Sequence, residues 1–427
     1  MIQVALLGCG TVGSGVVRVL TDNRQMIAQK VGEEICLKKV LERDRERCYT
    51  YGLTDEQITT DIQEIMDDKE ISIVIELIGG IETAFKFITM AIKSGKHIVT
   101  ANKDLLASRG KELFALAEEH HVDLYFEASV AGGIPIIMPM KQSLAANRVQ
   151  EVMGILNGTT NYILTKMSAE GSDYAEVLAE AQALGYAEAD PTADVDGLDA
   201  GRKVAILASI AFNSRVTFDD VHCEGIRKIQ AVDIAMADKM GYVIKLLGIA
   251  KCVDEKVLAC VHPTFIPKTH PLASVNDVFN AVFYRGDAVG DVMLYGRGAG
   301  QMPTASAVVG DVMEVCRNIR HNSTERIGCT CFEKRELLDI LEVENEFYIR
   351  LDVNDEPGVL AAIAGVFGKH MVSIASVDQE ANNEQGAARL ILITHVVKER
   401  NLREALAELE AMNMVQSICN VIRVYGK

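Results

Sequence analysis

The sequence predicts an α/β protein of three successive units: a doubly wound parallel sheet, an α+β domain and a small βαββαβ unit. Three observations lead to this prediction. Short apolar runs alternate with amphipathic stretches over residues 1–146, strands and longer helical patterns mix over 147–303, and a third alternation fills 347–427. At 427 residues, the chain is also too long for one compact core.

The first unit has the pattern of a doubly wound sheet. Its strands are expected at residues 2–7, 35–41, 71–78, 96–99 and 122–126. Helical patterns separate them, for example at 13–20 and 83–94. Strands that alternate with helices usually pair in parallel, with helices on both faces of the sheet.

The second unit is predicted to combine a mixed sheet with a helical region. Its strand-like runs lie at 149–156, 242–252, 257–263, 281–283 and 291–294. Helical patterns fill the chain from the first of these runs to Phe212. A further helix is expected at 304–320, and we expect the segment 304–323 to pack back onto the first unit.

A charged segment precedes the last unit. Residues 324–346 are dominated by charged side chains, and we expect them to form a linker. The segment 347–425 then shows strand, helix, strand, strand, helix and strand, in that order.

Composition and charge exclude several classes of protein. Apolar residues make up 49% of the chain and charged residues 24%, as in an ordinary globular enzyme. A net charge of −17, without any basic run, would repel nucleic acid and anionic membranes, so a small-molecule partner is expected. The apolar run at the N-terminus is broken at Gly8 and Gly10, far short of a membrane span. The ten cysteines are scattered without a CxxC pair, which favours reduced thiols and a cytoplasmic location.

A glycine-rich turn follows the first predicted strand. The sequence GCGTVG at residues 8–13 lies directly after that strand and opens the first predicted helix. In a Rossmann-type site, the glycines allow the tight turn, the approach of a pyrophosphate and close packing of helix on strand. The alternative is a glycine-rich turn that binds nothing. The predicted contacts with a dinucleotide are Gly8, Gly10, Thr11, Val12 and Gly13.

The end of the second strand bears on which dinucleotide is bound. A carboxylate there would bind the ribose hydroxyls of NAD, whereas an arginine would pair with the extra phosphate of NADP. Arg43 and Arg45 favour NADP, and Glu42 and Asp44 keep NAD open. Both arginines could also be ordinary residues of a solvated loop.

An acid-rich turn leads into an apolar helix at residues 185–208. Its carboxylates are Glu188, Asp190, Asp194, Asp196 and Asp199. Asp196 is expected to be the N-cap, which places Asp199 and Lys203 one turn apart on one face of the helix. The pair could be a surface ion pair of little energetic consequence. An acid-rich turn before a buried helix is instead where a cationic substrate group and a proton donor could meet.

A second lysine follows a strand of the first unit. Lys103 lies just after the strand predicted at 96–99, and ligands of open parallel sheets bind at the carboxyl ends of strands. The alternative is an exposed lysine at the start of a helix.

These segments together resemble the homoserine dehydrogenase family, along almost the whole chain. The segments that match are LGCGTVGSGV at 7–16, TANKDLLA at 100–107, FEASVAGGIPII at 126–137, GILNGTTNYIL at 154–164, DVDGLDAGRKVAILA at 194–208, PTFIPKTHPLASV at 263–275 and GRGAGQMPTASAVVGD at 296–311. The resemblance implies interconversion of L-aspartate 4-semialdehyde and L-homoserine with NADP, or alternatively NAD. This reaction belongs to threonine, methionine and isoleucine biosynthesis.

The resemblance also implies roles for the polar residues. Lys203 would donate a proton to the developing alkoxide, with Lys103 close to the reacting oxygen and the cofactor. Glu188 and Asp199 would hold the ammonium group of the substrate. A positioned ammonium group stabilises the charge that forms when a carbonyl is reduced, and it supplies the proton. The other substrate-site residues implied are Asp194, Thr159 and Tyr186.

A monovalent cation site is a further implication of the resemblance. Its ligands would be Glu127 and the carbonyls of Val130 and Gly132, and such an all-oxygen cage suits a hard cation such as Na⁺ or K⁺.

The last unit resembles a ferredoxin-like ACT domain. The βαββαβ order fits, and DEPGVL at residues 355–360 lies where the first strand of such a domain turns into its first helix. Feedback by an amino acid, with threonine as the expected effector, follows from the resemblance, as does assembly into a homodimer or homotetramer. The effector contacts expected are Asp355, Gly358, Val359 and Leu360. An ACT unit that serves only assembly is the alternative.

Two other functions compete with this one. Another amino- or hydroxy-acid dehydrogenase on the same scaffold would need a different catalytic set, and the nine histidines form no evident acid/base pair. An inactive amino-acid sensor would be expected to lack Lys203 or Asp199, and both are present. The chain begins directly at the dinucleotide strand, so we expect the monofunctional form of the enzyme.

Overall fold

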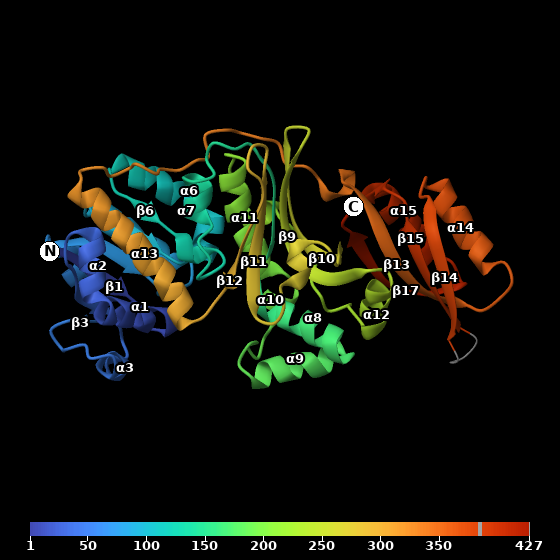
Figure 1. Ribbon diagram of the computed structural model, residues 1–427, viewed down its shortest axis with the longest axis horizontal. Coiled ribbons are helices and arrows are strands. Elements are labelled where there is room, and N and C mark those ends of the chain that lie inside the picture. Colours follow the sequence, from blue (N-terminus) through green and yellow to red (C-terminus); the bar gives the residue numbers. More distant parts are fainter. Residues whose placement is uncertain (383–386, 427) are drawn as a thin grey trace.

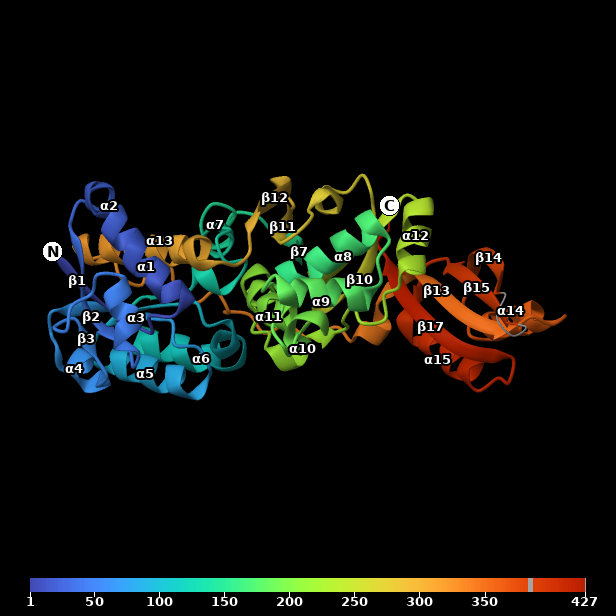
Figure 2. The same cartoon turned by 90° about the horizontal axis from the view of Figure 1, so that it is seen from below.

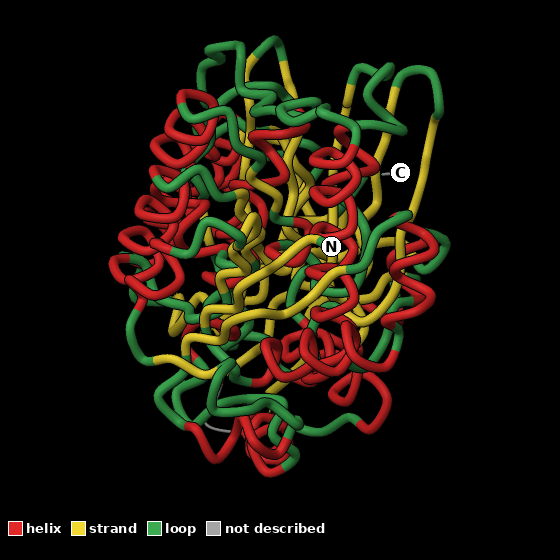
Figure 3. Tube along the Cα trace, turned by 90° about the vertical axis from the view of Figure 1, so that its left-hand side faces the viewer, coloured by secondary structure: helices red, strands yellow, loops and turns green. Residues whose placement is uncertain are grey.

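The computed structural model describes residues 1–382 and 387–426. Three parts follow one another along its long axis: an N-terminal sheet with its helices, a central sheet, and a C-terminal unit (Figure 1). The view turned by 90° shows the same order (Figure 2). Seen from the N-terminal end, the strands lie in the middle with helices around them (Figure 3).

The N-terminal part is a six-stranded sheet in the order β3-β2-β1-β4-β5-β6, and every neighbouring pair is parallel. Its strands are β1 (Ile2–Leu7), β2 (Ile35–Leu41), β3 (Ile58–Thr59), β4 (Ile71–Glu76), β5 (His97–Thr100) and β6 (Leu124–Tyr125). Its helices are α1 (Thr11–Asp22), α2 (Arg24–Val31), α3 (Arg45–Thr50), α4 (Ile62–Asp67), α5 (Glu82–Lys93), α6 (Lys103–Glu119) and α7 (Ile137–Lys141). The strand order reverses between β1 and β4, which is where ligands bind in such sheets. The predicted doubly wound sheet is confirmed, although the two-residue β3 lacks any pattern that would have predicted it.

A late helix completes this part. The helix α13 (Gln301–Arg320) lies along α1 and α2 (Figure 1). Its buried residues Val308, Val312 and Val315 share one apolar core with Val4 and Val16 of the N-terminal sheet. The two helices approach so closely that a Cβ added at Gly15 would lie 2.7 Å from the carbonyl oxygen of Gln301.

The other strands form one sheet of eleven, in the order β12-β11-β7-β9-β10-β17-β13-β15-β14 along its main path. The central part contributes β7 (Val149–Ile155), β8 (His222–Cys223), β9 (Tyr242–Val253), β10 (Lys256–Pro267), β11 (Phe279–Gly286) and β12 (Gly290–Arg297). Its helices are α8 (Gly158–Glu170), α9 (Tyr174–Ala183), α10 (Thr192–Val195), α11 (Leu198–Ala211) and α12 (Ala231–Lys239). The helix α11 packs tightly on β9, because a Cβ added at Gly248 would lie 2.5 Å from the side chain of Val204.

The C-terminal unit has the predicted ferredoxin-like order, with one short extra strand. Its elements are β13 (Glu344–Asn354), α14 (Val359–Lys369), β14 (Ile374–Asn382), β15 (Ala387–Thr394), β16 (Val397–Lys398), α15 (Glu399–Glu410) and β17 (Val415–Val424). Apolar residues of β13, β15 and both helices form one core. The sheet continues into the central part, because β17 pairs in parallel with β10 through Thr264–Arg423 and Phe265–Val424.

The charged segment at 324–346 lies against the central part. Bridges join Ser214 to Glu333 and Val257 to Leu337, and the segment contains one short 3₁₀ turn, Ile340–Glu342, before β13 begins at Glu344. No helix among the described residues is both long and apolar enough to cross a membrane.

Candidate active site

The glycine turn has the geometry that a dinucleotide site needs. Gly8 has a φ of +94°, and a Cβ added at Gly13 would lie 2.1 Å from the carbonyl oxygen of Gly8. These positions therefore require glycine for the turn and for the packing of α1 on β1. A Cβ added at Gly10 would meet nothing within 4 Å, so the side of the turn where Thr11 and Val12 begin α1 is open.

The carboxylate of Glu42 closes this turn from the end of β2. It accepts hydrogen bonds from the backbone amides of Cys9 at 2.8 Å, Arg43 at 2.8 Å and Asp44 at 3.2 Å. Burial raises the pKa of Glu42, but these three amide donors outweigh burial and leave the pKa below its usual value. The side chain of Arg43 is exposed and makes no hydrogen bond or ion pair with any described residue, whereas Arg45 pairs with Asp55 at 3.0 Å.

Two lysines from different domains meet on one carboxylate. Asp199 and Lys203 lie one turn apart on α11, and Lys203 Nζ is 2.7 Å from Asp199 Oδ2. Lys103, the first residue of α6, places its Nζ 2.9 Å from Asp199 Oδ1. Lys203 Nζ also donates to the carbonyl oxygen of Leu156 at 2.6 Å. The cluster therefore lies where the carboxyl end of β5 faces the central part.

Burial distinguishes this cluster from an ordinary surface ion pair. The side chains of Lys203 and Asp199 are each 10% exposed, and that of Lys103 is 33% exposed. Burial raises the pKa of Asp199, but the ammonium groups of Lys203 and Lys103 hold that pKa well below its usual range. Burial lowers the pKa of Lys103, but Asp199 outweighs burial and raises it. The carboxylate thus stays ionised and keeps Lys103 charged.

Asn157 belongs to the cluster, and the sequence argument missed it. Its Oδ1 accepts from the backbone amide of Thr160 at 2.9 Å, as the N-cap of α8. Its Nδ2 donates to Asp194 Oδ1 at 2.7 Å and to Asp199 Oδ2 at 2.9 Å. Burial raises the pKa of Asp194, partly offset by this amide. An Asn between a strand and a helix predicts an N-cap, but not the two carboxylates that it reaches.

The acid-rich turn is arranged differently from the prediction in one respect. Asp196 is not the N-cap of α11: Gly197 has that position, with a φ of +79°, and the Asp196 carboxylate pairs with Arg227. The Asp196 carboxylate that was expected to cap α11 is therefore bound by Arg227, which lies 31 residues further along the chain. The predicted spacing of Asp199 and Lys203 is correct nevertheless, because it depends only on helical geometry.

The loop at 185–190 lies at the edge of the cluster. Glu188 is exposed and forms no ion pair with any residue that the structure describes. Thr159 Oγ1 donates to the carbonyl oxygen of Tyr186 at 2.6 Å, and the Tyr186 ring packs edge-on against Tyr162 with centroids 5.0 Å apart. The structure therefore brings Thr159 and Tyr186 together but leaves Glu188 apart from Asp199.

The segment proposed for a cation is a buried loop beside α7. The Glu127 carboxylate accepts from the backbone amides of Ile136, Ile137 and Met138, and its main-chain carbonyl accepts a long hydrogen bond of 3.4 Å from the amide of Val130. The carbonyls of Val130 and Gly132 are buried and accept no hydrogen bond from the described residues. Buried carbonyl oxygens without donors fit a hard monovalent cation, and they would supply its cage.

The residues expected to contact an effector surround the turn between β13 and α14. Gly358 has a φ of +95° and precedes α14, and both Asp355 and Gly358 are exposed. Leu360 is exposed, whereas Val359 is buried in the core of the unit. Three of the four expected contacts are therefore available to a ligand or a second chain.

Comparison with protein families matches three segments of the chain. Residues 8–127 match the NAD binding domain of homoserine dehydrogenase, residues 135–313 match homoserine dehydrogenase itself, and residues 347–413 match the ACT domain. Together these segments cover most of the chain, and they coincide with the glycine turn, the lysine cluster and the C-terminal unit.

Individual relatives match over nearly their whole length. The homoserine dehydrogenase of Synechocystis sp. is 48% identical over 432 residues, covering 99% of this chain and 99% of the relative. That of Bacillus subtilis is 43% identical, covering 100% of this chain and 98% of the relative.

Comparison with solved structures leads to the same family. A homoserine dehydrogenase from Thiobacillus denitrificans has a TM-score of 0.94 at 41% identity, covering 99% of this chain and 98% of that one. A hyperthermophilic archaeal homoserine dehydrogenase in complex with NADPH has a TM-score of 0.63 at 26% identity, covering 74% of this chain and 97% of that one. The chain therefore belongs to the homoserine dehydrogenase family, as an NAD(P)-dependent oxidoreductase with a C-terminal ACT domain.

Proposed function

We propose that this chain interconverts L-aspartate 4-semialdehyde and L-homoserine, with Lys203 as the proton donor to the alkoxide in the reducing direction. The observation that carries this proposal is the Asp199 carboxylate, which holds Lys103 and Lys203 together at the junction of the two domains. A pair of ammonium groups beside the carboxyl end of β5, one buried and one partly exposed, suits a reaction that develops negative charge on oxygen.

The chemistry assigned to the residues follows from their charges. The nicotinamide, when bound, supplies or accepts the hydride at the C4 carbon of the substrate. As the aldehyde carbon gains the hydride, its oxygen becomes an alkoxide, which Lys203 protonates from Nζ and Lys103 stabilises electrostatically. In the oxidising direction, Lys203 takes the same proton back. Asp199 keeps both ammonium groups on one side of the reacting oxygen.

The substrate's own ammonium group needs a carboxylate. Asp194 and Asp199 lie in the cluster, and Asp194 is bound there through one oxygen by Asn157. Glu188 is proposed as a third carboxylate, which requires the loop at 185–190 to fold over the bound substrate. Thr159 and Tyr186, already joined by a hydrogen bond, would line this side of the site.

We propose NADP as the preferred cofactor, with NAD as the alternative. Gly8, Gly10, Thr11, Val12 and Gly13 would form the pyrophosphate side of the site. The unpaired Arg43 is available for a ribose phosphate, whereas Glu42 already accepts three backbone amides. The NADPH complex of the archaeal relative supports this preference.

Three regulatory and structural properties are proposed with this function. Threonine is proposed as an effector at the turn between β13 and α14, with an ACT unit that serves only assembly as the alternative. The carbonyls of Glu127, Val130 and Gly132 are proposed to hold Na⁺ or K⁺. A homodimer or homotetramer is the proposed assembly.

The test is oxidation of NADPH, followed by absorbance, with L-aspartate 4-semialdehyde as substrate. Parallel assays replace NADPH with NADH, add threonine, and exchange Na⁺ or K⁺ for a bulky organic cation. Rapid oxidation that is faster with NADPH supports the proposal and the cofactor preference. No oxidation with either cofactor, by folded protein in the presence of monovalent salt, would refute the proposed activity.

A further inference from the structure

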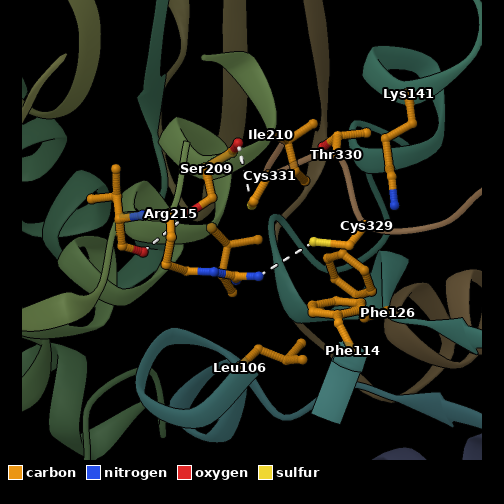
Figure 4. A pocket seen from close by; sticks show the side chains of 12 residues that line it. Leu106, Phe114, Phe126, Lys141, Ser209, Ile210, Arg215, Cys329, Thr330 and Cys331 are labelled. Carbon is orange, nitrogen blue, oxygen red and sulfur yellow. Dashed lines mark hydrogen bonds between the residues drawn. The ribbon is translucent and has the colours of Figure 1, made fainter. Parts of the chain in front are cut away.

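A pair of cysteines borders a small pocket behind the catalytic helices. The pocket lies between α6, α7 and α11, and the segment at 329–331 forms one wall (Figure 4). Its volume is about 20 Å³, which is room for a molecule about the size of water. The side chains of Leu106, Phe114 and Phe126 make much of the wall apolar.

Two cations without a carboxylate partner face this pocket. Arg215 Nη2 donates to the Sγ of Cys329 at 3.3 Å, and the guanidinium lies 5.6 Å from the centroid of the Phe114 ring. Lys141 lies 5.3 Å from the centroid of the Phe126 ring. Neither cation forms an ion pair with any Asp or Glu among the described residues. Burial lowers the pKa of Lys141 against the opposing charges of the cysteines, Asp311 and Glu127, so Arg215 is the cation bound directly to the Cys329 sulfur.

The two thiols have different surroundings. Cys329 is exposed to solvent, whereas Cys331 is half-buried and its Sγ lies 3.8 Å from the carbonyl oxygen of Ser209. Hydrogen bonding from Cys331, together with Arg215 and Lys141, holds the pKa of the Cys329 thiol below its usual value. The pKa of Cys331 is raised, first because of Cys329 and then because of burial. One thiolate and one thiol are thus placed two residues apart.

A second cysteine–arginine contact differs in the charges around its arginine. Arg335 Nη1 lies 3.2 Å from the Sγ of Cys252, but Arg335 also pairs with Glu333 and Glu255. Those two carboxylates compensate the charge of the Arg335 guanidinium. The charge of the Arg215 guanidinium has no such partner among the described residues and acts on the Cys329 thiol. Three deeply buried cysteines differ in another way, because burial raises the pKa of each to about 12: Cys9, Cys260 and Cys316.

We propose that Cys329 and Cys331 form a peroxide-reactive thiol pair, with Cys329 as the nucleophile and Cys331 as the resolving thiol. The Cys329 thiolate attacks one oxygen of hydrogen peroxide, the O–O bond breaks, and hydroxide leaves as Cys329 becomes a sulfenic acid. Cys331 then attacks the Cys329 sulfur, and the hydroxyl leaves as water with the Cys331 proton. The two thiols lose two electrons, and peroxide is reduced to water.

The spacing permits this disulfide. Residues two apart lie at most about 7 Å apart at their Cα atoms, and the Cα atoms of disulfides usually lie about 4.4–6.8 Å apart. A modest turn at Thr330 is therefore enough. The neighbouring backbone is tightly turned at Cys331, because the amide of Phe332 donates to the carbonyl oxygen of Thr330 at 3.0 Å.

Peptide mass spectrometry of the full-length protein tests this proposal. Both cysteines fall in one tryptic peptide, residues 327–334, between Arg326 and Lys334. Limited hydrogen peroxide is expected to remove two hydrogens from this peptide before the peptides of Cys36 or Cys252 are modified. Cys331→Ser should leave a sulfenic acid on Cys329 that dimedone traps, and Cys329→Ser should abolish both products. Failure of the peptide to oxidise ahead of the other cysteines would overturn the proposal.

A matched pair of arginine variants tests the cause of the reactivity. The midpoint of the pH dependence of Cys329 alkylation by iodoacetamide should move up by about one pH unit in Arg215→Gln, because the guanidinium no longer stabilises the thiolate. Arg335→Gln is the control and should leave the alkylation of Cys329 unchanged. If Cys329 reacts no faster than Cys252 in the unmodified protein, or if Arg215→Gln has no effect, the assignment of Cys329 as the nucleophile is wrong.

Discussion

Two buried charge clusters use the same kinds of group in different ways. At the domain junction, Asp199 is surrounded by Lys103, Lys203 and Asn157. Where the C-terminal unit meets α12, Asp233 is surrounded by Arg350 and other donors, and the side chains of Asp233 and Arg350 are 0% and 2% exposed. Both clusters are built on one carboxylate, yet only the first has more cations than it needs and is partly open to solvent.

The cluster at Asp233 is saturated. Arg350 donates to both carboxylate oxygens at 2.8 and 3.2 Å, and Tyr348, Asn420 and the backbone amide of Gln230 donate as well. A carboxylate whose lone pairs are all used can hold two domains together but has nothing left for a ligand. The cluster at Asp199 instead leaves the side chain of Lys103 one-third exposed. The difference separates a structural cluster from one that can act on a substrate.

The largest effect is expected from Lys203→Met. Loss of the proton donor should lower kcat by about 10²–10⁴-fold, the usual contribution of general acid catalysis, while NADPH binding changes little. The measurement is steady-state NADPH oxidation together with NADPH binding by fluorescence. Wild-type turnover in this variant would show that another group protonates the alkoxide.

Arg350→Met should act on stability instead. It leaves Asp233 buried without its cationic partner, which costs about 3–5 kcal/mol of folding free energy. Thermal unfolding, followed by circular dichroism, should show a clearly lower Tm, while kcat below the transition stays close to that of the unmodified protein. An unchanged Tm would contradict the structural role given to this cluster.

Asn157→Ser separates the two functions of Asn157. Serine is as good an N-cap as asparagine, so α8 should keep its stability, but the amide that binds Asp194 and Asp199 is lost. We expect kcat to fall about tenfold, or about 1.4 kcal/mol in barrier height, with little change in Tm. Asn157→Ala is the control and should lose stability as well. A fall in Tm without a fall in kcat would show that Asn157 acts only as the N-cap of α8.

Asp199→Asn should shift a pH profile. Asp199 raises the pKa of Lys103 against the opposing effect of burial. The ion pair therefore stabilises the folded state fully at pH values below the unfolded lysine pKa, and this stabilisation is lost as pH rises through the folded pKa of Lys103. Without the carboxylate, burial dominates and the pKa of Lys103 falls. The alkaline limb of kcat/KM should therefore move to lower pH, in addition to any loss of rate. An unmoved limb would show that Asp199 does not control the charge of Lys103.

The sequence was a good guide to features that depend on local geometry. Helical spacing alone places Asp199 beside Lys203, and glycines directly after an apolar strand predict the turn at Gly8 and Gly13. Alternating patterns predicted five of the six strands in the N-terminal sheet. These features are encoded within a few residues, so no tertiary information is needed to find them.

The sequence was a poor guide to partners that are distant along the chain. Arg227 binds the carboxylate of Asp196, and Asn157 donates to Asp194 and Asp199, which lie 37 and 42 residues further along the chain. Likewise, nothing in the sequence around Glu127 shows that three backbone amides of α7 and its N-cap occupy its carboxylate. Each of these contacts depends on how separate elements pack, which periodicity does not encode.

The most direct measurement compares kcat for Lys203→Met and Arg350→Met with NADPH and L-aspartate 4-semialdehyde, at a temperature where both variants are folded. Our account predicts that Lys203→Met loses turnover while Arg350→Met keeps a kcat close to that of the unmodified protein. Equal loss in both variants, or turnover by Lys203→Met at the unmodified rate, would contradict the assignment of the Asp199 cluster as the catalytic one.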